Sequence, residues 1–283
     1  MDDIRLNGHS GCQVLLRRGN DNYYVIKKSK DKRYNQRLEI QCQKQKCEHI
    51  GLFDSAKVYR QYYDYNNLFC FEMQYISGIT LAEYMRTIQL NKIKDIADLF
   101  GAMIPNCMIY DKSAYKAFKK KVVDLKQIIC IDHFAIYKAF AILQDYSWDY
   151  IMCSPCHGDL TLENMIVSQK QVVLIDYLDS FYDSWLIDFA KIFQDIEIYW
   201  HYRYEEKLEN NLKIRLFSLR ELLLSRLYRL KDGIKLINSM YHILLLNLLR
   251  IVPYAFDEKT KEFLLESISY TIQQIEKEMS KTL

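Results

Sequence analysis

Two kinds of hydrophobic pattern divide the chain near residue 77. Before it, apolar side chains form short runs rich in Val, Ile, Tyr and Phe between polar turns, which is typical of β-strands. One pair of runs flanks Gly19-Asn20-Asp21 and another flanks the Asn-Asn turn at 66–67, so the pattern predicts two hairpins. A short strand is predicted at 4–6. Residues 33–46 are polar, rich in helix formers and free of Gly and Pro, and predict one helix.

After residue 77 the apolar positions take a helical spacing. Thr80 and Glu83 have the form of a capping box that begins a helix. Two later stripes keep the helical period, the second after a predicted cap at Asp257, and we expect both in the core. They are Leu186, Phe189, Phe193, Ile196 and Trp200, and Leu265, Ile268, Ile272, Ile275 and Met279. Residues 165–176 interrupt the helices with two β-rich runs, which predict an isolated hairpin.

These patterns predict an α+β fold of two lobes. Residues 1–76 would form a small antiparallel-sheet lobe with one helix, and residues 77–283 a large, mainly helical lobe that carries the hairpin. A chain of 283 residues that is half hydrophobic is long enough for both cores.

Composition narrows the partners and the compartment. The chain has 39 basic and 36 acidic side chains spread along its length, so its net charge of +3 favours neither nucleic acid nor a membrane surface. The longest apolar stretch, ILLLNLLRIV, is broken by Asn247 and Arg250 and is shorter than the roughly 20 residues of a membrane span. The start, MDDIRLNGHS, lacks the basic and apolar segments of a secretory signal. We expect a cytoplasmic protein.

Eight cysteines are more typical of small buried hydrophobes than of disulfides in a cytoplasmic chain. Cys42 and Cys47 lie near His49, and Cys153 and Cys156 form a second pair. A structural zinc site needs four closed ligands, and only Cys153 and Cys156 have the spacing of a zinc-finger pair, so we expect neither a zinc site nor a redox pair.

The candidate chemistry begins in the segment CHGDLTLENMIV, residues 156–167. Asp159 and Asn164 lie in a loop before the predicted hairpin, and Asp176 ends it, so three oxygen-bearing side chains come to one edge. Mg²⁺ prefers oxygen ligands and is held by one or two protein groups together with phosphates. Phosphoryl transfer needs such a metal and a base for the attacking hydroxyl. Asp159 suits the base, and Asn164 and Asp176 suit the metal.

The first lobe offers phosphate contacts. In NGHSGCQV, Gly8 and Gly11 flank a polar turn that contains Ser10, and glycine lets backbone N–H groups approach phosphate oxygens. Lys27 follows in YYVIK as a cation for the phosphates. Glu39 on the predicted helix would hold it by an ion pair, with Glu48 as a rival.

The order of glycine turn, Val-Ile-Lys, helix Glu, FEMQYISG, HGDLTLEN and LIDY resembles the protein-kinase-like fold. The HGD in place of HRD is similar to the aminoglycoside phosphotransferase and choline kinase family in particular. The resemblance covers about residues 4–200, and its strongest part is 156–190. It gives a specific fold to the two lobes predicted from the hydrophobic pattern.

The resemblance implies a role for each matching residue. Asp159 would be the catalytic base, Asn164 and Asp176 the Mg²⁺ ligands, and His157 a brace for the loop, whose backbone Asp188 would hydrogen-bond. Lys27 would contact the phosphates with Glu39 as its partner, the hinge at 74–76 would meet the adenine, and Ile166 would lie under it. The implied nucleotide-binding residues are Gly8, Ser10, Gly11, Lys27, Glu39, Gln74, Tyr75, Ile76 and Ile166.

The segment after Asp176 bears on the acceptor. A protein kinase uses a long activation segment there to bind a peptide, whereas Asp188 follows Asp176 after only twelve residues. We therefore expect a kinase that transfers the γ-phosphate of ATP or GTP, with Mg²⁺, to a hydroxyl of a small molecule. A sugar, an amino alcohol and an aminoglycoside-like compound all remain open as acceptors.

Two sets of side chains could bind that acceptor. Acidic groups would suit a polyamine, and an aromatic cage would suit a quaternary amine. The acids are Asp179, Asp183, Asp195 and Glu197, and the aromatics are Trp185, Tyr199, Trp200, Tyr202 and Tyr204. Both sets also fit ordinary roles, as a solvated helix face and as packing.

Two other function classes remain open. A nucleotide-binding pseudokinase would keep the fold but should have lost an ionic group, and Lys27, Asp159, Asn164 and Asp176 are all present. A helical binding module would make the loop incidental and predicts no Mg²⁺-dependent nucleotide binding. The sequence does not indicate an oligomeric state.

Overall fold

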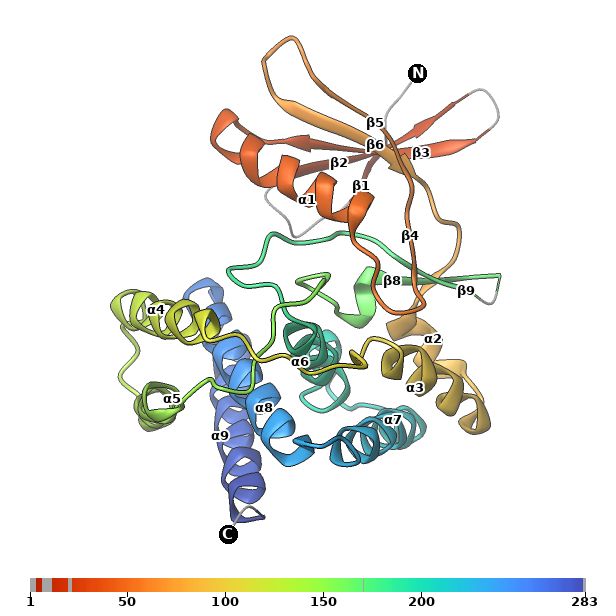
Figure 1. The fold of residues 1–283 in the computed structure, drawn as a ribbon. Coiled ribbons are helices and arrows are strands. Elements are labelled where there is room, and N and C mark those ends of the chain that lie inside the picture. The colour runs from red at the N-terminus through yellow and green to blue at the C-terminus, as the bar shows by residue number, and fades with distance from the viewer. Residues whose placement is uncertain (1–3, 7–11, 20–21, 170, 282–283) are drawn as a thin grey trace.

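The computed structural model describes residues 4–6, 12–19, 22–169 and 171–281 and has two lobes (Figure 1). A small sheet lobe lies above a larger helical lobe, in agreement with the predicted α+β architecture. The small lobe contains β1 (Ile4–Leu6), β2 (Cys12–Arg18), β3 (Tyr23–Ser29), α1 (Asn35–Cys47), β5 (Val58–Tyr63) and β6 (Phe69–Gln74).

The five strands of the small lobe form one antiparallel sheet in the order β1-β2-β3-β6-β5. Both predicted hairpins are confirmed, and Asn67 has the positive φ of 60° that asparagine tolerates in a turn. Lys27 lies in the middle of the sheet, opposite Val14 and Phe71. Because α1 packs Leu38 and Cys42 onto this sheet, Lys27 is held in a rigid layer.

A second sheet joins the lobes. It contains β4 (Asp54–Ser55), β7 (Ile79–Thr80), β8 (Met165–Ser168) and β9 (Gln171–Leu174), in the order β4-β9-β8-β7. The predicted hairpin at 165–176 is therefore present but not isolated, since both its outer edges are paired. Strands of two residues carry no periodic signal, which is why the sequence did not indicate them. The strand β4 comes from before residue 77, yet it pairs with a strand of the second lobe.

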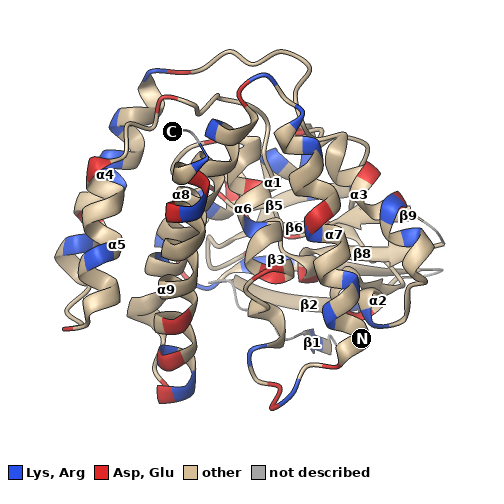
Figure 2. Ribbon diagram, turned by 90° about the horizontal axis from the view of Figure 1, so that it is seen from below, with Lys and Arg blue, Asp and Glu red and all other residues tan. Residues whose placement is uncertain are grey.

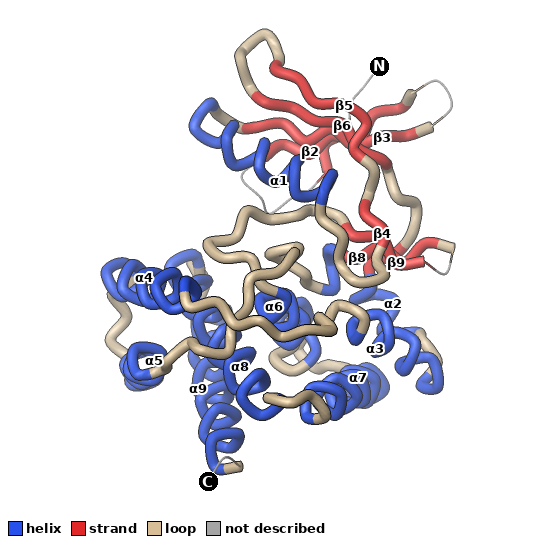
Figure 3. Tube along the Cα trace, in the orientation of Figure 1, coloured by secondary structure: helices blue, strands red, loops and turns tan. Residues whose placement is uncertain are grey.

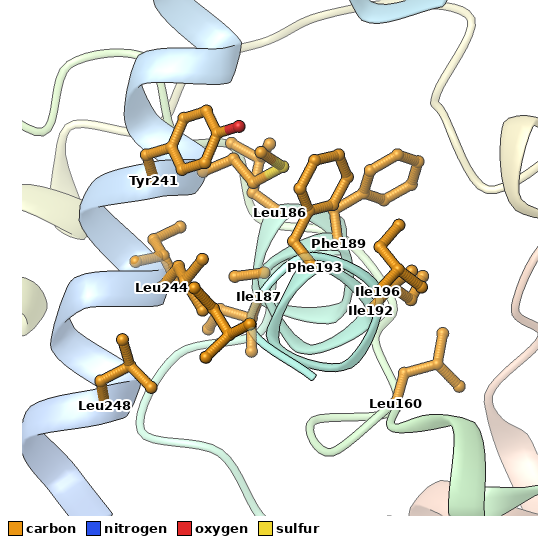
Figure 4. Close-up of a cluster of buried hydrophobic side chains, with 14 of the residues drawn as sticks. Leu160, Leu186, Ile187, Phe189, Ile192, Phe193, Ile196, Tyr241, Leu244 and Leu248 are labelled. Carbon is orange, nitrogen blue, oxygen red and sulfur yellow. The ribbon is translucent and has the colours of Figure 1, made fainter. Parts of the chain in front are cut away.

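The helices of the larger lobe surround α6. They are α2 (Leu81–Thr87), α3 (Ile93–Gly101), α4 (Ser113–Ile128), α5 (Phe134–Asp145), α6 (Trp185–Ile196), α7 (Asn210–Tyr228), α8 (Gly233–Ile251) and α9 (Glu258–Ser280). Figure 4 shows apolar side chains of α6 beside those of α8, with Ile187 of α6 next to Leu244 of α8. These side chains are fully buried, so α6 is fixed in the core.

The predicted caps and stripes can be checked against this lobe. Thr80 accepts the N–H of Glu83 and Asp257 accepts the N–H of Thr260, so both helix starts are confirmed. The first stripe is buried along α6, except that Trp200 lies beyond its end in a 3₁₀ turn. In the second stripe Met279 is 51% exposed, whereas the preceding residue, Glu278, is buried.

Two expectations from composition also change. Cys42, Cys70 and Cys156 are buried as small hydrophobes would be, but four other cysteines are exposed in loops or at a helix end. Segment 233–254 in the described chain is long and apolar enough to cross a membrane, but 78% of its most apolar window is buried, as in a core helix. Figure 2 shows basic and acidic positions spread over many elements.

Gly78 lies where the chain crosses from one lobe to the other. A Cβ at this position would collide with the backbone oxygen of Val167 and lie 2.8 Å from Cγ2 of Ile166. Because Val167 also pairs with Ile79, the connector packs directly on β8. Only glycine permits this approach without a shift of the backbone.

We predict that Gly78→Ala lowers the free energy of unfolding by about 1–3 kcal/mol, because β8 must move away from the connector. The matched control is Gly101→Ala, whose new methyl would meet only the guanidinium of Arg226, a group that can move aside. The control should stay within about 0.5 kcal/mol of the parent protein. Chemical denaturation of the three proteins measures the difference, and equal stability of the two variants would contradict the explanation.

Candidate active site

The loop at residues 156–164 is held by a buried carboxylate on α6. Asp188 is fully buried and accepts the backbone N–H groups of His157 and Gly158 at 2.7 and 2.8 Å. The hydrogen bonds that the resemblance implied are therefore confirmed. Burial raises the pKa of Asp188 to about 7, although both N–H groups act to lower it.

Gly158 is required at its position for two reasons. Its φ is +87°, in the region that side chains other than glycine rarely adopt. A Cβ there would also lie 2.6 Å from the backbone oxygen of Leu178 and from Oγ of Ser180. The segment after Asp176 thus packs directly across the loop, and Figure 3 shows this segment running as irregular chain from β9 to α6.

His157 links the two halves of the site. Its ring is fully buried, Nδ1 accepts the N–H of Asp159 at 3.3 Å, and Nε2 lies 2.7 Å from the backbone oxygen of Ile175. Burial lowers the pKa of His157 to about 4, so the ring is neutral and Nε2 donates to Ile175. This residue therefore fixes the loop against the chain immediately before Asp176.

The three oxygen-bearing side chains come together as the sequence predicted. The amide nitrogen of Asn164 donates to the backbone oxygen of Asp159 at 2.8 Å, and lies 3.4 Å from its carboxylate. The backbone oxygen of Asn164 accepts the N–H of Ile175 at 3.0 Å, which brings Asn164 next to Asp176. Asp176 itself has a φ of +65°, which aspartate tolerates better than most residues.

The donor set fits a hard cation. The carboxylate of Asp176 and the amide oxygen of Asn164 supply two oxygen ligands, because the nitrogen of Asn164 already donates to Asp159. Mg²⁺ in nucleotide sites is held by such a pair together with phosphate oxygens. Within the described residues no group of three or more His, Cys, Asp or Glu side chains gathers around a point.

Lys27 reaches this edge from the small lobe, but with a different partner from the one predicted. The ammonium of Lys27, whose side chain is 3% exposed, forms an ion pair with Asp176. Glu39 instead accepts a hydrogen bond from Tyr63. Glu39 follows Leu38, which packs on the sheet, so the turn of the helix carries Glu39 away from Lys27. The predicted Lys27–Glu39 ion pair does not form.

The inward face of α1 carries a lysine in place of an acid. Nζ of Lys44 lies 2.8 Å from Asp183 and 3.2 Å from the backbone oxygen of Leu178. Sequence reasoning missed this contact, although Lys44 falls on the same helical face as Leu38 and Gln41. Lys44 ties the small lobe to the segment that follows Asp176.

Lys191 is a further residue that the sequence analysis missed. Its ammonium, on α6, lies 3.0 Å from Oδ1 of Asp159, and its side chain is only 12% exposed. Burial by itself raises the pKa of Asp159, but Lys191, with a contribution from Arg250, lowers that pKa below its ordinary value. A lysine within the apolar helix, three residues after Asp188, was the available signal.

The remaining predicted nucleotide residues lie around the connector. Gln74 is the last residue of β6, and its N–H donates to the backbone oxygen of Lys57, while residues 75–76 lead toward β7. Tyr75 is 40% exposed and its ring meets that of Tyr23. Ile166 lies on β8 beside Gly78. The predicted phosphate turn with Gly8, Ser10 and Gly11 lies outside the described residues.

Most of the acids proposed for an acceptor are occupied within the fold. Asp195 is fully buried and accepts the N–H of Leu162 at 2.7 Å, and burial raises its pKa. Glu197 is buried and lies 2.9 Å from Arg220. Asp183 pairs with Lys44, which leaves Asp179 as the half-exposed member of the set.

The proposed aromatic residues do not form an open cage. Trp185 is fully buried, and Tyr202 is buried and donates to the backbone oxygen of Ala82. The guanidinium of Arg203 lies 4.1 Å from the ring of Trp200 and 4.3 Å from that of Tyr204. These rings already enclose a cation of the chain itself, so the packing interpretation fits them.

Comparison with known proteins gives the fold. No family model and no curated protein matches the chain. Solved structures match it closely in shape along nearly its whole length. A thermostable mutant of aminoglycoside phosphotransferase APH(4)-Ia in its apo form is 11% identical, with a TM-score of 0.63 over 97% of this chain and 94% of the other. The chain has the protein-kinase-like fold.

Other structures with this fold are also small-molecule kinases by name. A putative fructosamine-3-kinase from Haemophilus somnus 129PT is 12% identical (TM-score 0.55, covering 95% of this chain and 91% of the other). A choline/ethanolamine kinase family protein from Mesorhizobium loti is 12% identical (TM-score 0.56, 99% and 92%). At these identities the likeness establishes the protein-kinase-like fold alone.

We predict that Asp188→Ala lowers the free energy of unfolding by about 3 kcal/mol, because it leaves two buried N–H donors without an acceptor. The matched control is Asp179→Ala, which removes a half-exposed carboxylate from the segment just before α6 and should change stability by less than about 0.5 kcal/mol. Urea denaturation of both variants tests this. A loss as small in Asp188→Ala as in the control would show that the loop does not depend on Asp188.

Proposed function

We propose that the protein is a kinase that transfers the γ-phosphate of ATP or GTP, with Mg²⁺, to a hydroxyl group of a small molecule. The observation that carries this proposal is the meeting of Lys27, Asp159, Asn164 and Asp176 at one edge between the lobes. A mutant of the phosphotransferase of the same fold was solved with ADP and hygromycin B (13% identical, TM-score 0.58). That complex supports a nucleotide and a small acceptor as the two substrates.

In the proposed reaction each residue has a separate task. Lys27 binds nucleotide phosphates from the sheet, and the backbone at 74–76 meets the base above Ile166. Asn164 and Asp176 would hold Mg²⁺, which neutralises charge on the phosphates. Asp159 accepts the proton of the acceptor hydroxyl as that oxygen attacks phosphorus. Lys191 keeps Asp159 ionised and oriented for this step.

The segment between Asp176 and α6 favours a small acceptor over a protein. The N–H of Leu178 donates to the backbone oxygen of His157, and Ser180 packs against Gly158. Lys44 holds the same segment at Asp183. A segment fixed at these points has no free length with which to bind an extended peptide. A pseudokinase is the second candidate, but it should have lost an ionic group, and Lys27, Asp159, Asn164 and Asp176 are all present.

We expect Mg²⁺ with ATP or GTP to raise the melting temperature by several degrees, since saturation at about 100 times Kd adds about 2.7 kcal/mol. Asp176→Ala should lose most of this shift because a metal ligand is missing. Asp159→Asn is the matched variant: it should keep the shift but release ADP about 10²–10⁴-fold more slowly. Thermal-shift scans with Mg²⁺ or EDTA measure binding, and absence of a shift with either nucleotide would overturn the proposal.

The ion pair with Lys191 predicts a pH effect. Because Lys191 stabilises the charged form of Asp159, its loss in Lys191→Met should raise the pKa of Asp159, and the acidic limb of kcat/KM should move to higher pH by about one unit. Lys191→Arg should restore the original profile, and Lys213→Met, on an exposed face of α7, should not change it. The pH dependence of ADP release measures this. An acidic limb at the same pH in Lys191→Met would exclude this role.

A further inference from the structure

Basic side chains from separate elements gather beside the proposed catalytic base. Arg250 near the end of α8 and Lys121 on α4 both approach the ring of Phe181, which lies in the segment before α6. The guanidinium carbon of Arg250 is 5.6 Å from the centre of this ring, and Nζ of Lys121 is 6.0 Å from it. Arg37, on α1 of the small lobe, adds a third positive charge that acts on both.

Arg250 and Lys121 share the ring of Phe181, whose neighbour Ser180 packs against Gly158, the residue before Asp159. Its charge contributes to the lowered pKa of Asp159. Burial lowers the pKa of Arg250, Asp159 acts to raise it, and Arg37 acts in the same direction as burial. The hydrogen bond of Arg250 is to the neutral amide of Asn247, at 3.2 Å. In the described part of the chain no carboxylate forms an ion pair with Arg250.

Lys121, like Arg250, is half-buried beside another cation, whereas its neighbour Lys120 is largely exposed. Burial lowers the pKa of Lys121, with a further contribution from Arg250. Lys120, one residue earlier on α4, is 2.8 Å from Asp124 and largely exposed. Among the residues that the structure describes, Lys121 has no such ion pair. Of the nearby acids, Asp124 is taken by Lys120, and Asp159 by Lys191.

Half-buried like charges repel one another and lose hydration, so the arrangement is unfavourable unless an anion binds there. The positive charges of Arg250 and Lys121 would repel a cationic acceptor, and most of the acids that could bind one already have partners within the fold. An arginine and a lysine together suit a carboxylate or a phosphate. Lys27 and Asp176 lie at the nucleotide edge, so Arg250 and Lys121 are left for the acceptor.

We propose that the acceptor is an anionic small molecule, an alcohol that also carries a carboxylate or phosphate group, and that Arg250 and Lys121 bind this group while Asp159 receives the hydroxyl. The inference rests on the proposed kinase function. Neutral sugars, choline and aminoglycosides would then be poor substrates.

Sets of related acceptors that differ in charge test the proposed preference for an anion. ADP release is measured with glycerol, glycerate and glycerol 3-phosphate, with glucose, gluconate and glucose 1-phosphate, and with choline and kanamycin. We expect an anionic member to exceed the neutral member of its set by at least about tenfold in kcat/KM, the effect of one charged hydrogen bond. Comparison of the carboxylate and phosphate members identifies the group. Preference for a neutral or cationic acceptor would overturn the inference.

Single substitutions test whether Arg250 and Lys121 bind the anionic group. Arg250→Met and Lys121→Met should each raise the KM for the anionic acceptor about tenfold or more and change the KM for the nucleotide much less. Lys120→Met, on the same helix, should behave like the parent protein. Arg250→Lys should recover part of the affinity, since it restores the charge. A rise in the nucleotide KM alone would assign these cations to ATP and overturn the inference.

A binding measurement decides the question when no compound in the panel is phosphorylated. Inorganic phosphate is added to protein that already holds Mg²⁺ and the non-hydrolysable analogue AMP-PNP, with ionic strength matched by NaCl. Phosphate should raise the melting temperature further in the parent protein and in Lys120→Met, but not in Arg250→Met. Absence of this second shift would overturn the inference alone, whereas absence of the first shift, with AMP-PNP, would count against the kinase function.

Discussion

The loop at residues 156–164 depends on the two hydrogen bonds that buried Asp188 accepts from the backbone of His157 and Gly158. The same helix contacts the loop at two later points. Lys191, three residues further along α6, pairs with Asp159, and Asp195 accepts the N–H of Leu162. Residues at this spacing share one helix face. One polar stripe of a core helix thus holds the loop from its start to its end.

This arrangement explains why α6 has to be rigid. Its other faces are packed with apolar side chains against α8 and other neighbours (Figure 4), so the polar stripe has a fixed position. A buried carboxylate is unfavourable in itself, and it is tolerated because backbone N–H groups satisfy it. The packed helical core therefore fixes the position of the loop through the polar side chains of α6. The backbone contacts before and after Asp159 hold its carboxylate where Lys191 can pair with it.

The small lobe is joined to this loop by a different kind of contact. Lys27 pairs with Asp176, and Lys44 pairs with Asp183. These two acids lie before and after the residues that pack against Gly158, so two lysines of the small lobe hold this segment at both ends. Ion pairs with one buried member add little net stability but favour one geometry over others. Together with β4, they fix how the small lobe sits above the loop. A nucleotide bound between the lobes would meet groups already in place.

The sequence predicted the elements and the chemical groups better than the partners. Alternating and helical patterns report which face of an element is buried, and the hairpins, the caps and the stripe on α6 follow from them. They do not report what faces that surface from elsewhere in the chain. Glu39 was therefore placed with Lys27 when helix rotation directs it to Tyr63, and Lys44 and Lys191 were missed although both lie on buried helix faces. The two-residue strands β4 and β7 left no pattern at all.

The charge around the proposed acceptor site also differs between the sequence as a whole and the folded chain. Nearly equal numbers of acids and bases over the whole chain suggested no preference among partners. In the fold, however, acids and bases are separated: Asp188, Asp195 and Glu197 are buried as partners of backbone or arginine groups. Arg250 and Lys121 remain beside Asp159 without a carboxylate of their own in the described chain. Local charge near a site is set by which groups the fold has already paired, and this determines the charge of the ligand that can bind there.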